Sequence, residues 1–585
     1  MIYENLPAIA LSWETFRTLW ILLPLLPAAG IILMLIANYI LPGDPTGTIF
    51  HGTLCAQILL GGLILSAAGT IGADPHEIAV SLWEYAIVFR VDRLKLIHLG
   101  ILMVPLVLAL PKYHSIDSPY LRIIFLFFLA GCSGVIVTGD MFNLFVFYEL
   151  MIMAAYVLVA AKHHFAEAIK YMMFGSISSI TFLGGIIVLY AGGAPFTIHT
   201  ESYAAIPEAN AWWAMVLFTV AFGVKSAFFP IALAPCHAAA GSIFSAFLAS
   251  FTIFTGMIGL HYFVLQPAAL LEMPAFFSLI RTLSVLTIVM PSLILFWEPA
   301  YNRAVAQSTI IAIGITGLLL SYGAQEYAFL YVGVHAVYKS LLFLLGDTLK
   351  QTARTLQADS WLAILMLGIG VFLAAGITPG LTAHFKASLD PMPFWIQAAL
   401  LLSGFCVIGG FCKFRYSCNT KANQHAQTWR SYLLYSLFVS MILLLYCQLG
   451  LPSLRYAGTV MEFSALGAAL LIGKRIYRAF PAMISMDRHW IYGSLNRQLF
   501  YIILLFSFVL IWLYPTSRRL EKKGLSVPNS SIFCTFPGCG EATETHPALQ
   551  PMPLGMQRVT ASSEPNEQLQ VPAGHAVLVE SIPDL

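Results

Sequence analysis

Long apolar windows separated by short polar segments fill most of the chain. A helix rises about 1.5 Å per residue, so about 20 apolar residues cross the hydrocarbon of a bilayer. Windows of that kind lie at about 18–41, 49–72, 93–111, 119–138, 141–161, 169–192, 211–232, 240–264, 277–297, 303–321, 327–346, 360–384, 393–413 and 431–450. Two weaker windows follow at about 457–473 and 497–514. The pattern predicts roughly fourteen core transmembrane helices and one or two more at the C-terminal end.

The windows predict helices throughout the membrane part. No stretch alternates with period two as the strands of an outer-membrane barrel do, so helices must satisfy the backbone in lipid. Pro230 interrupts the seventh window, and Gly376, Pro379 and Gly380 interrupt the twelfth. Because the interruptions are five windows apart, we predict an all-α polytopic protein with two five-helix repeats, about 119–264 and 277–413. A unit with an odd number of helices, repeated in tandem across a membrane, must be inverted.

Composition agrees with a membrane location. The 585 residues are 59% hydrophobic and 10% charged, with a mean hydropathy of +0.81. From about residue 516 the chain becomes rich in Ser, Pro, Glu, Gln and Gly, which predicts a disordered tail over 516–585. We therefore divide the chain into N-terminal helices (1–92), a core (93–450), extra C-terminal helices (451–515) and this tail. The net charge of +2 carries no information about nucleic acid, and no basic block in the apolar part suggests a nucleic-acid partner, so we expect none.

Loop charges predict the orientation. The loops after the sixth and eighth windows, 193–210 and 265–276, contain no Lys or Arg. The loops after the fifth, ninth, eleventh and thirteenth windows contain Lys162, Arg303, Lys350, Arg354, Lys413, Arg415, Lys421 and Arg430. By the positive-inside rule these loops are cytoplasmic, which places the N-terminus outside an inner (plasma) membrane. If both weak windows span, the basic cluster at 518–523 falls outside, so the number of late spans stays open.

Glu149 lies about midway along the apolar run VTGDMFNLFVFYELMIMAAYVL. A charge at the bilayer centre costs about 2.5–3.5 kcal/mol on insertion scales, and intramembrane ionisable groups usually serve a function. The alternative is a neutral glutamic acid that is hydrogen-bonded between helices and has no transport role.

Lysine and histidine side chains interrupt other apolar windows. Lys225 lies five residues before Pro230, where a broken helix indicates a hydrated path; a lysine snorkelling to the surface is the alternative. His335 and Lys339 are four apart and share a helix face, which favours a relay over a histidine that only donates to a carbonyl. Lys386 follows the second helix break. We hypothesise that ions move as a buried Glu149–Lys225 pair breaks and forms.

The sequence predicts no redox chemistry within the chain. The nine cysteines show no zinc or iron–sulfur spacing, and no dinucleotide-binding or paired-histidine haem motif is present. We therefore expect no metal, no cofactor and no catalytic residues. Electron transfer, if it is coupled to this chain, takes place in partners.

Several motifs in order resemble one family. They are DMFNLFVFYELM with Glu149, KYMMFGSISS with Lys170, VKSAFFPIALAPCHAAAGSIFSAFL with Lys225 and His237, YNRAVAQSTIIAIG, HAVYKSLLFLLGD with His335 and Lys339, and GITPGLTAHFK with Lys386. Over about 90–450 the chain resembles the antiporter-like subunits of respiratory complex I, membrane-bound hydrogenases and multisubunit Mrp-type sodium/proton antiporters. The phrase TGDMFNLFVFYE is most similar to the Mrp D-type subunit and its relatives.

The resemblance implies a fourteen-helix core with a central hydrophilic axis that moves H⁺ or Na⁺ and is coupled to partner membrane subunits. It makes Glu149 and Lys225 the switching pair of the first half-channel, His335 and Lys339 the central relay, and Lys386 part of the exit. Lys170 and His237 join the candidate ion path. In the eighth helix, Phe254 stands where the family often has a lysine, and His261 or His237 is a candidate to replace it.

Two other functions stay open at this point. The absent eighth-helix lysine favours a structural subunit that assembles a complex without conducting. A self-sufficient secondary transporter for an organic solute is the third possibility.

Overall fold

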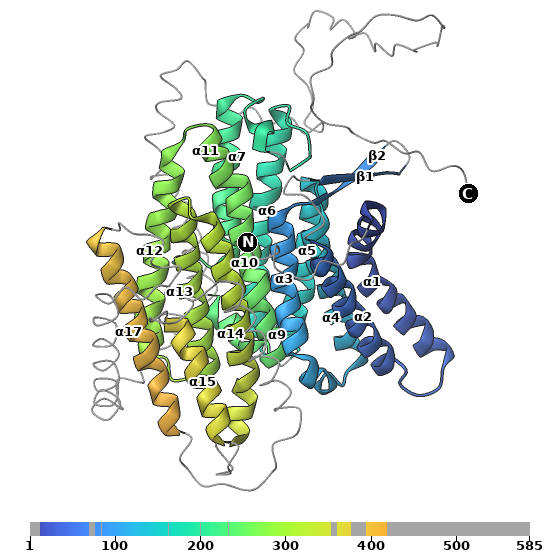
Figure 1. Ribbon diagram of the computed structural model, residues 1–585, viewed down its shortest axis with the longest axis vertical. Helices are drawn as coiled ribbons and strands as arrows, with labels where there is room; N and C mark the ends of the chain where they lie inside the picture. Colours follow the sequence, from blue (N-terminus) through green and yellow to red (C-terminus); the bar gives the residue numbers. More distant parts are fainter. Residues whose placement is uncertain are drawn as a thin grey trace, which may run out of the picture.

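The fold is a bundle of long apolar helices, shown in a computed structural model (Figure 1). The structure describes residues 12–68, 76–82, 85–161, 163–198, 200–231, 233–352, 360–375 and 393–417. In this part of the chain, ten helices are long and apolar enough to cross a membrane. The chain is therefore a multi-pass helical membrane protein.

The candidate spans coincide with the predicted windows. They are α1 (Trp13–Ile40), α2 (Thr46–Ala67), α4 (Pro119–Val137), α5 (Met141–Ala160), α6 (Phe165–Ala191), the composite helix Ser242–Leu270, α12 (Pro274–Trp297), α13 (Tyr301–Ser321), α14 (Gln325–Thr352) and α17 (Phe394–Ser417). The windows 93–111, 211–232 and 360–384 give the shorter helices α3 (Arg93–Leu108), α7 (Glu208–Lys225) and α15 (Ser360–Ala375). The window 431–450 and both weaker windows lie outside the described residues.

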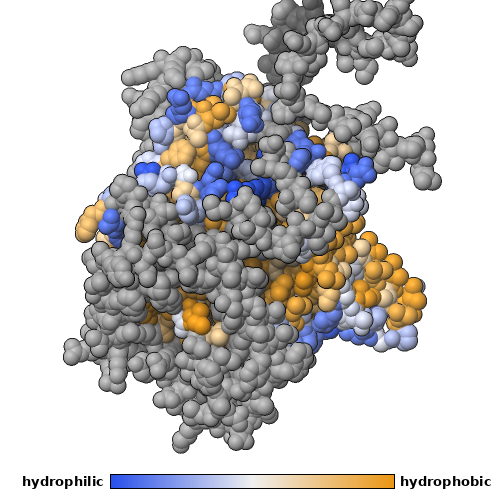
Figure 2. All heavy atoms as spheres, in the orientation of Figure 1, coloured by the Kyte–Doolittle hydropathy of each residue, from blue (hydrophilic) through white to orange (hydrophobic). Residues whose placement is uncertain are grey.

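The helices differ in what surrounds them. The helices α1 and α2 form one flank of the bundle and α17 the opposite flank (Figure 1). Apolar side chains gather on the flank formed by α1, α2 and their neighbours (Figure 2), where Leu25, Ile32 and Leu33 of α1 are exposed. The composite helix and α13 are instead buried along their whole apolar windows. Polar groups on these central helices are thus removed from lipid.

The predicted interruption near Pro230 is present, but it begins earlier than expected. The helix α7 ends at Lys225, and the chain resumes as the short α8 (Ala234–Ala239) before turning at Gly241, whose φ is +84°. The composite helix that follows contains two π-helical turns, Leu248–Thr252 and His261–Leu265, between α9 (Ser242–Phe247), α10 (Ile253–Leu260) and α11 (Gln266–Leu270). Such turns often mark functional sites in helices.

The second predicted interruption cannot be compared in the same way. Gly376, Pro379, Gly380 and Lys386 lie outside the described residues, because α15 ends at Ala375 and the description resumes at residue 393. The layout in two inverted repeats therefore stays a prediction.

A β-hairpin corrects the prediction that the chain is all-α. The strands β1 (His76–Leu82) and β2 (Tyr85–Val91) pair antiparallel, with His76 opposite Val91 and Leu82 opposite Tyr85. The backbone N–H of Gly139 donates to the carbonyl of Val88 at 2.8 Å, which fastens the hairpin to the corner between α4 and α5. The hairpin leads directly into α3, so it fixes where that helix begins.

Candidate functional site

Lys225 lies inside the bundle at the C-terminal end of α7. Its side chain is 5% exposed, and its Nζ has no hydrogen-bond partner within the described part of the chain. The ammonium instead lies 5.1 Å from the ring centroid of Tyr148 and 5.6 Å from that of Tyr171. Aromatic faces and the carbonyl end of a helix both attract a cation. The break after α7 therefore places a lysine where rings, rather than oxygen atoms, hold it.

Glu149 follows Tyr148 on α5 and is half-buried. Its carboxylate lies within electrostatic range of Lys225, but the two groups form no direct hydrogen bond or ion pair among the described residues. The structure thus brings Glu149 and Lys225 close together, but their side chains are not in direct contact. The switching pair stays a prediction.

His237 extends this group of residues away from α5. It lies on α8, is 1% exposed, and has an Nδ1 without a hydrogen-bond partner in the described residues. Its ring centroid is 6.1 Å from that of Tyr171, and it lies within electrostatic range of Lys225. We name Glu149, Tyr148, Tyr171, Lys225 and His237 the Lys225 chamber.

Lys170 lies at the edge of this chamber. It is half-buried on α6, and together with Glu167 it lies within electrostatic range of Cys236, the neighbour of His237. Its position is compatible with the predicted ion path, and its role stays a prediction.

His335 and Lys339 share the buried face of α14, as their spacing predicts. Both are fully buried, and both ring nitrogens of His335 lack a hydrogen-bond partner in the described residues. The Nζ of Lys339 donates to the carbonyl of Val305 at 2.9 Å and to the hydroxyl of Ser308. We name His335, Lys339 and Ser308 the α14 group.

Phe254 stands beside the α14 group. Its ring centroid lies 4.6 Å from that of His335 in an edge-to-face contact. Gly256 on the same helix allows α10 to pack closely against the end of α7, because a Cβ at that position would lie 2.3 Å from Ser226 Oγ and 3.0 Å from the Phe222 carbonyl oxygen. Phe254 therefore places an apolar ring directly against His335 of the α14 group.

His261, the other candidate to replace that lysine, lies further along the composite helix. It pairs with Gln266 at 3.1 Å between their Nε2 atoms, and its ring contacts that of Phe329. His261 therefore bonds to a residue near the end of its own composite helix and not to His335.

Sequence reasoning missed two buried basic residues on α3. Lys95 is 5% exposed, and its Nζ donates to the carbonyls of Ile136 at 2.8 Å and Thr138 at 2.6 Å. His98, one turn later, lies 3.2 Å from the Thr255 hydroxyl through its Nε2 and stacks on Phe251. Lys95 and His98 are three residues apart in an apolar helix, and that spacing was the signal that could have revealed them.

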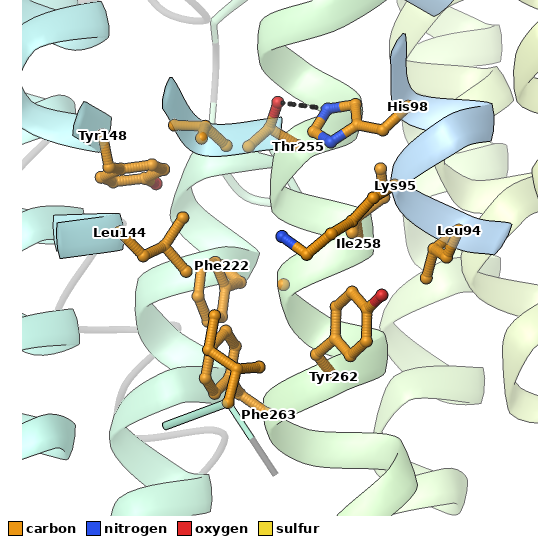
Figure 3. Close-up of a pocket in the computed structure, with 13 residues that line it drawn as sticks. Leu94, Lys95, His98, Leu144, Tyr148, Phe222, Thr255, Ile258, Tyr262 and Phe263 are labelled. Carbon is orange, nitrogen blue, oxygen red and sulfur yellow. Dashed lines mark hydrogen bonds between the residues drawn. The ribbon is translucent and has the colours of Figure 1, made fainter. Parts of the chain in front are cut away.

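These residues border a small cavity between α3, α5, α7 and the composite helix (Figure 3). Its volume is about 30 Å³, which is enough for one or two water molecules. Figure 3 shows the Lys95 ammonium pointing toward the space bordered by Leu144, Phe222 and Tyr262. We name this space the Lys95 cavity.

Among the described residues, no group of three or more His, Cys, Asp and Glu side chains is arranged to hold a metal ion. The chemistry available in this part of the chain is that of buried or half-buried amines, imidazoles, hydroxyls and carboxylates. The fold and the site together define a multi-pass membrane protein with ionisable groups inside its bundle.

Comparisons with known proteins agree with the motifs. Residues 138–389 match the family described as NADH:quinone oxidoreductase/Mrp antiporter, TM. Over this segment the chain resembles this superfamily of antiporter-like membrane proteins, as its motifs predict, and in particular its Mrp D-type members. The matched segment contains Glu149, Lys225, His335 and Lys339, but not Lys95 or His98.

Relatives and solved structures give the extent of the similarity. The chain is 25% identical over 434 residues to the D-type subunit of the Na⁺/H⁺ antiporter of Bacillus subtilis, which covers 68% of this chain and 85% of that protein. It is 25% identical over 271 residues to the N-type subunit of the NADH-quinone oxidoreductase of Desulforudis audaxviator, covering 44% and 54%. A protein of the Mrp complex from Dietzia sp. DQ12-45-1b has a similar fold, with a TM-score of 0.66 and 17% identity over 89% of this chain and 61% of that one.

Proposed function

We propose that the chain is an ion-translocating subunit that moves H⁺, Na⁺ or both through the membrane part of a multisubunit antiporter or a complex related to NADH:quinone oxidoreductase or hydrogenase. The observation that carries this proposal is Lys225, a buried ammonium with no hydrogen-bonding oxygen among the described residues and with a carboxylate within electrostatic range. A charge buried without a partner costs free energy that a purely structural role does not explain. The relatives named as antiporter subunits support the same class of function.

In this proposal, Lys225 alternates between the tyrosine rings and the Glu149 carboxylate. When the ammonium approaches Glu149, its positive charge is compensated by the carboxylate. The neighbouring groups then no longer experience the electric field of an uncompensated ammonium. When it moves back, its charge acts on His237 and on groups beyond Tyr171. Each change in the pair alters how favourable it is for a cation to occupy the next position, which is how a buried pair couples to ion movement.

The remaining assignments belong to the same proposal. Lys170 and His237 extend the first half of the path, His335 and Lys339 form its centre, and Lys386 its exit. The chain acts with other membrane subunits, in an inner (plasma) membrane, with its N-terminus outside. The core over 93–450 carries the path, flanked by the N-terminal helices, the late helices and the polar tail.

Replacing Glu149 with Ala tests this proposal. We expect coupled flux of H⁺ or Na⁺ to be abolished in membrane vesicles that contain the assembled complex, while the partner subunits still co-purify. The matched control is Glu14→Ala, because Glu14 is an exposed acid in the first turn of α1. Normal coupled flux in a stable Glu149→Ala complex would rule out the switching pair.

A structural subunit that does not conduct is the second candidate. The observation that favours it is the packing of Phe254 against His335, which places an apolar ring beside the α14 group, where the related antiporter subunits often have a lysine. Lys225→Ala separates the two candidates: unchanged flux in the assembled complex would indicate a scaffold. Purification in mild detergent with identification of the co-purifying subunits tests the third candidate, a self-sufficient transporter, because such a protein would purify alone.

A further inference from the structure

The α3 residues that give the Lys95 cavity its charge, Lys95 and His98, lie outside the segment that matches the family. Five polar side chains border it: Lys95, His98, Tyr148, Thr255 and Tyr262. A cavity holds water when it is large enough and offers two to four polar partners. This one meets both conditions.

Lys95 provides the donor that such water needs. An ammonium has three N–H groups, and the carbonyls of Ile136 and Thr138 accept two of them. Because the ammonium points toward the cavity (Figure 3), its third N–H is available to a molecule placed there. Leaving a buried charged donor unpaired is costly, so water in the cavity would stabilise the observed position of Lys95.

The cavity is connected to a carboxylate at one end. Tyr262 borders the cavity, and its hydroxyl donates to both carboxylate oxygens of Asp92, at 2.9 and 2.8 Å. Asp92 also accepts the backbone N–H of Lys95 at 2.9 Å and pairs with Arg90 at 3.0 Å. Its side chain is 12% exposed at the start of α3, directly after the hairpin, so this end is partly accessible.

At its other end the cavity reaches the Lys225 chamber. Tyr148 borders the cavity and also presents its ring to Lys225 at 5.1 Å. Phe222, another bordering residue, lies one turn before Lys225 on α7. Tyr148 therefore belongs to both sites, and Phe222 lies next to it in the cavity wall.

We propose that the Lys95 cavity is a hydrated branch of the ion path, in which water bonded to Lys95 joins Asp92 to the Lys225 chamber. This inference rests on the proposed function. The ligand is water, and Lys95 is the positioning residue that retains it. His98 and Thr255 form the wall on the side of the composite helix.

The first test is structural and does not depend on flux. High-resolution electron cryo-microscopy of the full chain in its purified complex should show ordered water within hydrogen-bonding distance of Lys95 Nζ. The same map of a Lys95→Met complex should lack it. A dry cavity in the unmodified protein would overturn the proposal.

The second test fills the cavity without removing a hydrogen bond. Leu144 borders the cavity and points into it (Figure 3), so Leu144→Phe occupies the space of the water. We expect flux to fall roughly 10-fold or more, because a step of proton transfer through positioned groups is lost. Leu144→Ile conserves the volume and should behave like the unmodified protein.

Lys225→Ala, measured in the same vesicles, separates this inference from the proposed function. Loss of flux in Lys225→Ala, Leu144→Phe and Lys95→Met supports both. Loss in Lys225→Ala alone overturns the hydrated branch and leaves the proposed function intact. Normal flux in Lys225→Ala overturns the proposed function and, with it, the branch.

Discussion

Lys225 and Lys339 are both buried lysines inside one bundle, but their surroundings differ. The ammonium of Lys225 faces the rings of Tyr148 and Tyr171 and has no hydrogen-bond partner in the described residues. The ammonium of Lys339 donates to the Val305 carbonyl and the Ser308 hydroxyl. One cation is held by diffuse attraction and the other by two oxygen atoms.

The magnitudes decide which lysine is free to move. A cation–π contact contributes about 0.5–2 kcal/mol and has little directionality. A hydrogen bond to a charged group contributes about 1.5–3 kcal/mol and requires a defined geometry. Lys225 can therefore change position at a smaller cost than Lys339. This difference makes Lys225 the switching group of the proposed path and Lys339 a fixed positive charge.

The largest effect is expected for Lys225→Met. Flux should fall about 100-fold or more, because the only basic group of α7 in the chamber is lost. The melting temperature of the complex in detergent should stay the same or rise, since removing an unpaired buried charge relieves a desolvation cost. Lys225→Arg, which keeps the charge, is the control. A clear drop in melting temperature would mean that Lys225 is held more firmly than its contacts indicate.

Compared with Lys225→Met, Lys339→Met should lower the stability of the complex more and its ion flux less. It removes the hydrogen bonds of the Lys339 ammonium to the Val305 carbonyl and the Ser308 hydroxyl, and a hydrogen bond to a charged group contributes about 1.5–3 kcal/mol of stability. Flux should fall about 10-fold, less than for Lys225→Met, because a fixed charge tunes the path without carrying the switch. Ser308→Ala removes one acceptor and should lower the melting temperature less. Equal melting temperatures for Lys339→Met and Lys225→Met would remove the distinction between the two lysines.

The positions of the membrane-spanning helices could be predicted from the sequence, because a helix must be apolar over a fixed length to cross lipid. Each apolar window from 18–41 to 393–413 coincides with a described helix, since about 20 apolar residues are needed to cross the bilayer. The apolar pattern places the end of α7 too late, at residue 232 rather than Lys225. Proline marks where a helix must end but not how many residues before it the chain already turns.

The contacts of the lysines were less predictable. The spacing of His335 and Lys339 located them on one face, but whether a lysine meets rings or carbonyls depends on helices far away in sequence. Lys95 shows the same limit: its acceptors belong to the end of α4, and the β-hairpin that directs α3 toward them has only a short alternating pattern at Ile78 and Val80. In the sequence alone, Lys95 lies near the start of the window 93–111, and nothing there shows that it is buried.

Substitutions of Tyr171 sharpen the claim that rings hold Lys225. Tyr171→Phe keeps the aromatic face, so flux should change less than about 2-fold and stability by less than about 0.5 kcal/mol. Tyr171→Leu keeps an apolar side chain but removes the face, and it should weaken the position of Lys225 by about 0.5–2 kcal/mol and lower flux several-fold. Both are measured in the vesicle assay used for Lys225→Met. If the two variants behave alike, the ring does not act on Lys225 through its face.

The smallest effect on ion flux and melting temperature is expected for the ion pair between Arg122 and Asp44, which lies away from Lys225 and Lys339. Arg122 donates to the Asp44 carboxylate at 2.8 Å, to the Thr46 hydroxyl at 2.9 Å and to the Ile116 carbonyl at 2.9 Å. The hydroxyl of Thr46 and the guanidinium of Arg122 lower the pKa of Asp44, which lies in the loop between α1 and α2. Because the pKa is lower in the folded protein than in the unfolded chain, the stabilisation is present above the ordinary aspartate range and is lost as the pH falls through the folded value.

Asp44→Asn should therefore lower the melting temperature slightly at neutral pH and not at acidic pH. Added salt should diminish this difference in melting temperature, since the carboxylate is 49% exposed. Flux should not change in this variant. A loss of flux as large as that of Lys225→Met would show that ion movement depends on the paired cation Arg122 as much as on the unpaired Lys225.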